Sequence, residues 1–392
     1  MALPNIVINK GKGGLGRALP QEDYISGLVF YLPNANLPAG FLTTDRIKEV
    51  FSIEEAEALG ITEGSAATGV LWYDINEYFI MQPKGDLYVG LYDSVTPDLT
   101  SVELVQVFAL GKIRQFGVHS PAAVFAGSAV TTLQVSAVAM AAADTPAEII
   151  YSADFSAVAD LSTLADLRGL AAPNVSVVLG EDGAGAGAAL AVSSTKSVSA
   201  LGAVLGAVSL ASVNENIGYV AKFNIATGTE FDVPAMANGQ LVQNLALSLL
   251  GTLNDRGYIF LRKYTGLAGS YFNDAPTATP VSGDYAYIEN NRTINKAIRN
   301  ARIGLLPNLN GPILVNPTTG KLSEETISKY VNDADSALDQ MLRDSEVSGK
   351  GIIINPDQNV LTTSKIVVTV QIVPVGVART IEVNIGFVVK LS

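Results

Sequence analysis

Short apolar runs along the first 120 residues predict several strands. Residues 24–31 (YISGLVFY) and 86–93 (DLYVGLYD) are rich in the branched and aromatic side chains that are typical of strands. Residues 102–119 fit either a helix or a strand, and the pattern favours a strand near 113–118. We therefore expect at least three strands in this part of the chain.

Two helices are predicted between the first two of these strands. Residues 51–61 (FSIEEAEALGI) begin with Ser52, and Glu55 lies three positions later, which is the spacing of a capping box. Residues 70–81 form the second predicted helix, and Pro83 ends it. Strands and helices thus already alternate in the first quarter of the chain.

From residue 128 onward the alternation becomes regular. Apolar residues first recur at helical spacing at Val130, Leu133, Ala137 and Met140. The segments that follow are predicted as strand 147–154, helix 161–170, strand 174–180, helix 198–211 and strand 217–224. Elements of these lengths in this order predict a mixed α/β fold with some parallel pairing.

A helix predicted over 287–307 carries two stripes. Its apolar face is Ile294, Ala297, Ile298 and Ala301, and its cations are Arg292, Lys296, Arg299 and Arg302. A solvated face is the usual role of such a basic stripe. The alternative is that the four cations meet an acidic neighbour.

A further helix over 323–347 is predicted to begin at Ser323, with glutamates in its first turn. Its expected buried stripe consists of Ile327, Val331, Ala334, Leu338 and Met341. Its expected exposed face is acidic and consists of Asp333, Asp335, Asp339, Asp344 and Glu346.

The chain ends in alternating apolar and polar residues without an obvious partner nearby. The apolar side of the last predicted strand is Ile381, Val383, Ile385 and Phe387. Its other side is Glu382, Asn384 and Gly386. Pro374 and Gly376 interrupt the preceding strand and predict a hinge there. One apolar and one polar face suit a strand that docks on the core of another chain.

Composition narrows the possible functions. Of 392 residues 48% are hydrophobic and only 16% are charged, against about a quarter in ordinary soluble domains, which indicates surface shared between copies. The net charge of −12 argues against binding to nucleic acid and to anionic membranes. The uncharged run 115–143 is long enough for a bilayer, but its Ala, Ser and Thr content favours one or two buried helices. The start of the chain has no apolar core of a signal peptide.

Candidate chemistry is weak. The chain has no cysteine and one histidine, His119, beside Pro121, so neither a multi-histidine metal site nor a thiol nucleophile is expected. Glycines 183, 185 and 187 follow a strand but lack the full dinucleotide spacing, and two acids precede them, so a flexible loop is favoured. Asp274 and Asp284 could form the carboxylate pair of a glycosidase, although an ordered loop is favoured there too. We therefore expect no enzyme and no cofactor.

Four segments resemble the contractile tail sheath proteins of phages and of related bacterial contractile injection systems. They are 200–220 (ALGAVLGAVSLASVNENIGYV), 257–309 with its FNDAPTATP and DYAYIENNR motifs, 312–327 with TGKLS, and 359–387 with VPVGVARTIEV. The resemblance covers the chain from about residue 200 to the end and extends back to Phe41, apart from residues 120–170.

The resemblance implies a structural subunit that polymerises as stacked rings in a helical sleeve around an inner tube. Contraction of the sleeve would drive the tube through a target envelope. The implied partners are further copies of the chain, the inner tail tube protein, the baseplate and terminator or cap proteins, with no nucleic acid and no membrane insertion. The implied location is a phage tail or injection particle assembled in the bacterial cytoplasm. The alternatives are another tail or baseplate component, or an α/β enzyme acting on nucleotides or glycans.

The resemblance also implies a division of the chain and a set of contact residues. We expect an N-terminal arm (1–20), the first part of an α/β core (21–120), a central region or outer subdomain (121–230), the conserved core (231–378) and a C-terminal arm strand (379–392). Residues predicted to pair with neighbouring subunits are Ile6, Val7, Ile8, Arg379, Ile381, Val383, Ile385 and Phe387. By charge complementarity we expect Asp333, Asp335, Asp339 and Asp344 to face the tube.

Overall fold

A seven-stranded sheet forms the body of the protein. The computed structural model describes residues 22–95 and 97–387. The strand order is β2-β3-β1-β4-β5-β6-β9, and every neighbouring pair is parallel except β2 with β3. The strands are β1 (Ile25–Leu32), β2 (Ile47–Val50), β3 (Asp86–Asp93), β4 (Gln115–Val124), β5 (Glu148–Asp154), β6 (Val175–Val178) and β9 (Tyr258–Ile259).

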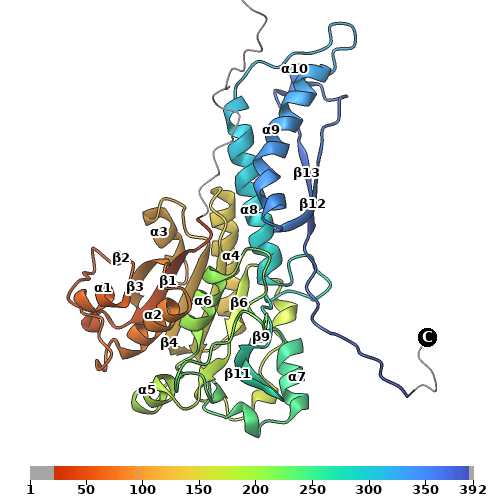
Figure 1. Ribbon diagram of the computed structural model, residues 1–392. Coiled ribbons are helices and arrows are strands. Elements are labelled where there is room, and N and C mark those ends of the chain that lie inside the picture. The colour runs from red at the N-terminus through yellow and green to blue at the C-terminus, as the bar shows by residue number, and fades with distance from the viewer. Residues whose placement is uncertain (1–21, 96, 388–392) are drawn as a thin grey trace, which may run out of the picture.

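Helices cover both faces of this sheet, so the body has three layers (Figure 1). The side chains of β1 show why, because they alternate between two cores: Leu28 and Phe30 point to one, Val29 and Tyr31 to the other. The first core packs under α1 (Ile53–Ala58), α2 (Gly69–Met81), α5 (Ala186–Ser194) and α6 (Leu201–Leu210). The second packs under α3 (Ser101–Phe108), α4 (Gly127–Ala142) and α7 (Leu247–Asp255).

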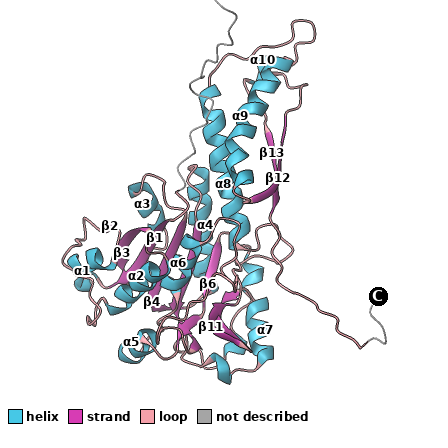
Figure 2. Cartoon of the chain, viewed as in Figure 1, coloured by secondary structure: helices cyan, strands magenta, loops and turns pink. Residues whose placement is uncertain are grey.

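Two long helices and a hairpin extend from one side of the body (Figure 2). They are α8 (Ile288–Leu305), α9 (Glu324–Arg343), β12 (Val347–Ile353) and β13 (Thr369–Pro374), with the short α10 (Val360–Thr363) between the two strands. Their core includes Ala297, Leu338, Met341 and Val347. Two further strand pairs are β7 (Gly180–Asp182) with β8 (Pro234–Met236), and β10 (Leu261–Tyr264) with β11 (Leu267–Phe272).

Most predicted elements are confirmed at their expected places, including the strands β1, β3, β4 and β5 and the helices α1, α2, α4, α6, α8 and α9. The run 115–143, for which one or two buried helices were favoured beside a strand near 113–118, is the strand β4 followed by the helix α4. Ser52 caps α1 as predicted and accepts a hydrogen bond from the Glu55 backbone N–H at 3.3 Å.

Two predicted elements are wrong. Residues 161–170 form two short 3-10 turns, Leu161–Thr163 and Leu167–Leu170, because Asp160 and Asp166 each cap their own turn and divide the segment. Residues 217–224, predicted as a strand, form turns. Their apolar side chains are buried all the same, with Ile217 and Phe223 in the first core.

Candidate assembly interface

The β12–β13 hairpin has one covered face and two open edges. Ile352, Val370 and Ile372 pack towards α8 and α9, which fixes which face of the hairpin is buried. Within the described residues, β12 and β13 pair only with each other, so the outer edge of each strand leaves backbone groups without a strand partner. Such edges can accept a strand from another chain.

The segment that follows β13 forms no strand with the rest of the chain. Residues 375–387 have no regular secondary structure, and the segment leaves the body towards the C-terminus (Figure 1). The apolar side chains predicted to pair with a neighbour are exposed to between 69% and 111%, at Ile381, Val383, Ile385 and Phe387. Four large apolar side chains, one at every second residue, therefore lie in water in the single chain.

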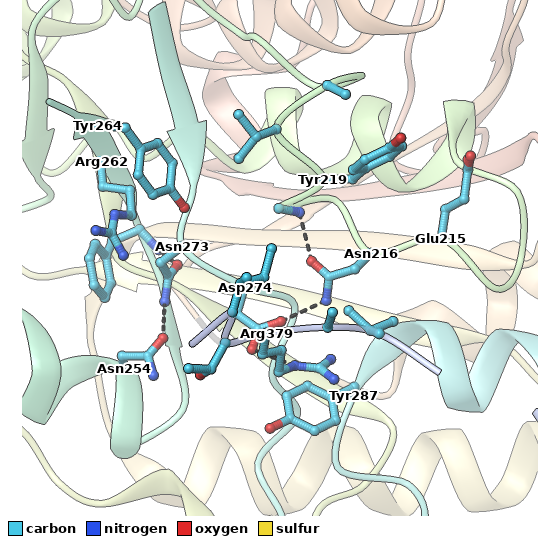
Figure 3. Close-up of a pocket in the computed structure, with 18 of the residues that line it drawn as sticks. Glu215, Asn216, Tyr219, Asn254, Arg262, Tyr264, Asn273, Asp274, Tyr287 and Arg379 are labelled. Carbon is cyan, nitrogen blue, oxygen red and sulfur yellow. Dashed lines mark hydrogen bonds and ion pairs between the residues drawn. The ribbon is translucent and has the colours of Figure 1, made fainter. Parts of the chain in front are cut away.

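Arg379 is the point at which this segment is fixed to the body. Its guanidinium carbon lies 3.4 Å from the centroid of the Tyr287 ring, and its Nε donates to Asp274 at 2.8 Å. Its second terminal nitrogen donates to Glu289 in the first turn of α8. Figure 3 shows the guanidinium beside Asp274 and Tyr287. The residue predicted to contact a neighbour thus contacts its own chain.

The ionisation of this group reflects its partners. Partial burial lowers the pKa of Arg379, but Asp274 and Glu289 outweigh that effect and raise the pKa overall. Burial raises the pKa of Glu289, and the charge of Arg379 opposes that rise. Arg379 is therefore charged at any physiological pH, and its removal would leave Glu289 buried without its cation.

Arg379 borders a cavity of about 1170 Å³ between the body and the C-terminal segment. Polar and aromatic side chains line it, including Asn216, Asn254, Asn273 and Tyr264 (Figure 3). Asn216 donates to both Asp274, at 2.6 Å, and Glu289, at 3.0 Å. The motifs FNDAPTATP and DYAYIENNR marked this part of the chain in the sequence. They did not indicate that Asp274, Tyr287 and Glu289 hold Arg379.

The first two cations of the basic stripe of α8 are buried and Arg299 is partly buried, which corrects the expectation of a solvated face, while Arg302 is exposed. Arg292 and Lys296 are 4% and 6% exposed, whereas Ile298, predicted to be buried, is 50% exposed. The cations turn inward because acids lie there: Lys296 bridges Asp23 at 2.8 Å and Glu346 at 2.5 Å. Arg299 binds Asp23 at 2.5 Å. The alternative hypothesis was that the cations meet an acidic neighbour, and these acids belong to the same chain.

Several acids on and next to α9 also bind side chains of the same chain. Lys350 on β12 lies 2.7 Å from both Asp335 and Asp339, and Asp333 accepts a hydrogen bond from Asn308 at 2.7 Å. Asp344 is exposed and accepts from Gln340. Glu346, expected on the exposed face, is 5% exposed. Where these acids lie relative to a tube stays a prediction.

The glycine-rich segment is ordered rather than a flexible loop. Glu181 and Asp182 are buried in β7, and glycines 185 and 187 lie at the start of α5. The first backbone N–H of α5 donates to the carboxylate of Glu230 at 2.9 Å. An acid of the chain itself therefore occupies the helix end at which a nucleotide phosphate would bind.

The other candidates for chemistry have structural partners. His119 is fully buried, and its Nδ1 lies 2.5 Å from Asp74, also fully buried. Asp274 binds Arg379, whereas Asp284 is exposed. The described residues show no partner that the two acids share. Among the described residues no group of acids or histidines is arranged to hold a metal ion. No described helix is long and apolar enough to cross a bilayer.

The remaining predicted contact residues lie partly outside the described part. Ile6, Val7 and Ile8 belong to residues 1–21, which the structure does not describe. Pro374 is the last residue of β13. A Cβ atom placed on Gly376 would meet no atom within 4 Å. The hinge prediction stays a prediction.

Two family models together cover almost the whole chain. The model described as "DUF2586, N-terminal domain" matches residues 3–276, and the one described as "DUF2586, C-terminal domain" matches residues 284–392. No curated protein matches the sequence.

Several solved structures share the fold over nearly the full length. The contracted helical sheath of the anti-feeding prophage is 13% identical, with a TM-score of 0.65 over 98% of this chain and 99% of that chain. The contracted sheath complex of an extracellular contractile injection system, PVC, is 13% identical, with a TM-score of 0.63 over 99% and 98%. A sheath tail protein from Desulfitobacterium hafniense is 8% identical, with a TM-score of 0.52 over 95% and 100%. The mixed α/β fold predicted from the sequence is thus the fold of these sheath proteins.

Proposed function

The chain belongs to the DUF2586 family, and we propose that it is a structural subunit of a contractile sheath that polymerises as a helical sleeve around an inner tube. The observation that carries this proposal is the exposed apolar segment 381–387 on a fold shared with sheath proteins. Four exposed apolar side chains, one at every second residue, on an otherwise folded chain need a partner.

The hairpin β12–β13 is the acceptor that the structure offers. A donated strand satisfies the open backbone groups of an edge and places every second side chain on one face. We propose that the apolar face of 381–387 extends the covered face of a neighbour's hairpin, where Ile352, Val370 and Ile372 lie. Residues 6–8 are proposed to pair with a neighbour in the same way.

A structural role agrees with the state of the polar groups. Asp274 is engaged by Arg379, and His119 is sealed in the core with Asp74. We propose that the chain is not an enzyme and needs no cofactor. Its proposed partners are copies of itself, an inner tube protein, and baseplate and terminator or cap proteins. Its proposed location is a phage tail or a bacterial injection particle assembled in the cytoplasm.

Negative-stain electron microscopy of the purified protein at increasing concentration tests the proposal. A sheath subunit should give tubes of constant width and variable length. Compact particles at every concentration, with and without an added inner tube protein, would contradict the proposal and favour a non-polymerising α/β protein.

A further inference from the structure

Both terminal segments of the described chain are fixed to the same helix. Arg379, where the C-terminal segment leaves the body, binds Glu289 in the first turn of α8 and stacks on Tyr287, the residue before it. Asp23, the second described residue after residues 1–21, binds Lys296 and Arg299 in the middle of α8. Glu289 and Lys296 are seven residues apart, about 10 Å along a helix.

Helix α8 is itself firmly attached to the sheet body. Arg292 donates to the backbone carbonyl oxygens of Ala211 and Ser212, and Asn291 to that of Pro173. Asn295 donates to Glu148 at the start of β5. These polar side chains are buried, with exposures between 2% and 8%. A force applied to α8 therefore reaches β5, the segment before β6 and the segment after α6 at once.

The position of Arg379 determines how a pull on the C-terminal segment would act. Pro374 pairs with Val347 at the open end of the β12–β13 hairpin. A pull transmitted along the backbone would separate β13 from β12 one residue pair at a time, starting at that end. Arg379 comes before that point on the path of the force, and its contacts with Asp274, Glu289 and Tyr287 must break first. It thereby protects the hairpin from being peeled apart.

We propose that α8 carries tension between the two arms, with Asp23 and Arg379 as its anchors, so that force between neighbouring subunits bypasses both the hairpin and the ends of the sheet. This inference rests on the proposed sheath function. It assigns positioning roles to Asp23 and Arg379 that differ from strand pairing itself. Because the two anchors act in series, we expect a sleeve under force to break at the weaker anchor.

The test compares how sleeves of Asp23→Asn, Arg379→Gln and the double variant break under a fixed dose of shear, with sleeve length measured by electron microscopy. Arg302→Gln is the matched control, because Arg302 lies on the same helix and its pair with Asp144 is about half exposed. We expect each anchor variant to assemble and then to give fragments at least about threefold shorter than the wild type and the control. The double variant should match the weaker single variant.

The melting temperature of each unassembled subunit separates anchoring from folding. We expect sleeve length to change far more among the variants than the melting temperature does. If Arg379→Gln fails to fold, Arg379→Lys keeps the charge but loses planar stacking on Tyr287, and it should give fragments of intermediate length. Sleeves of the anchor variants that break like the control, or a double variant whose effect is the product of the single effects, would overturn the inference. Wild-type protein that forms no sleeves would instead refute the proposed function.

Discussion

A Cβ atom placed on Gly202 would lie 2.0 Å from the backbone carbonyl oxygen of Asp74. Helix α6 therefore lies directly on the backbone of α2, and its next turn repeats the contact, since a Cβ on Gly206 would lie 2.7 Å from the carbonyl oxygen of Tyr78. Glycines four residues apart let the two helices approach to this distance. The Gly- and Ala-rich composition of α6 is thus a requirement of packing.

Gly202→Ala should lower the free energy of unfolding by about 2–4 kcal/mol, because the backbone that it meets cannot move aside as a side chain can. Chemical denaturation of the subunit measures the change. The control is Gly251→Ala in α7, where a Cβ atom would meet nothing within 4 Å. This substitution should raise the free energy of unfolding by about 0.5–1 kcal/mol. Equal effects of the two substitutions would contradict the packing argument.

Deletion of residues 380–392 should leave a folded subunit that cannot form sleeves. The deletion keeps Arg379 and its partners, and it removes side chains that are exposed in the single chain, so the melting temperature should change little. Sedimentation and electron microscopy would report the loss of polymers. Long sleeves from the truncated protein would refute the role of this segment in assembly.

Within the segment, apolar and polar positions should differ sharply. Ile385→Asn removes one of the exposed apolar side chains and should raise the concentration needed for assembly about tenfold or more, a change of about 1.4 kcal/mol. Asn384→Ser, one residue away on the other face, is the matched control and should assemble as the wild type does.

The tube-facing prediction for α9 now needs a design that separates charge from fold, because Asp335 and Asp339 both bind Lys350. Asp335→Asn combined with Asp339→Asn removes the acidic charge together with the two ion pairs. Lys350→Gln breaks the same ion pairs but leaves the acids. If the charge of α9 faces the tube, only the double aspartate variant should bind the tube more weakly, with an affinity lower by about tenfold. Equal behaviour of the two variants would exclude that role.

The stability of the subunit should fall as the pH rises from about 4.5 to about 8. Burial raises the pKa of Glu148 to about 8, an effect that Asn174 and Asn295 only partly oppose. Burial likewise raises the pKa of Glu77 and of Glu181 to about 8. Between the two limits the folded chain holds these protons and the unfolded chain releases them, so unfolding becomes more favourable with rising pH.

Glu148→Gln should remove part of this dependence. Near pH 8.5 the variant should be more stable than the wild type by on the order of 3 kcal/mol, while near pH 4.5 the two should be similar. Urea denaturation across this range measures the slope, with Glu63→Gln at an exposed position as the control. Parallel curves for the wild type and Glu148→Gln would show that Glu148 is ionised in the folded state.

The pattern of apolar residues was sufficient for elements that depend on local sequence. The cap at Ser52, the start of α9 at Ser323 and the strand β3 each follow from neighbours within a few positions, so they were predicted at the right place. The prediction of one helix over residues 161–170 was wrong because Asp160 and Asp166 each accept a hydrogen bond from a backbone N–H group of the segment. On α8, periodicity correctly indicated a helix and the burial of Ala297, but it missed the burial of Arg292 and Lys296 and the exposure of Ile298. The acids that pair with Lys296 come from residues 23 and 346.

The sequence by itself determined the α/β class, the resemblance to sheath proteins and the apolar alternation of the last strand, because each of these depends on residue order within short segments. Only the tertiary structure decided what those segments contact. Arg379 and Glu289 are 90 residues apart, and Asp23 and Arg299 are 276 residues apart, yet they form ion pairs. Such pairs depend on the path of the whole chain, which brings charges together where burial makes an unpaired charge costly.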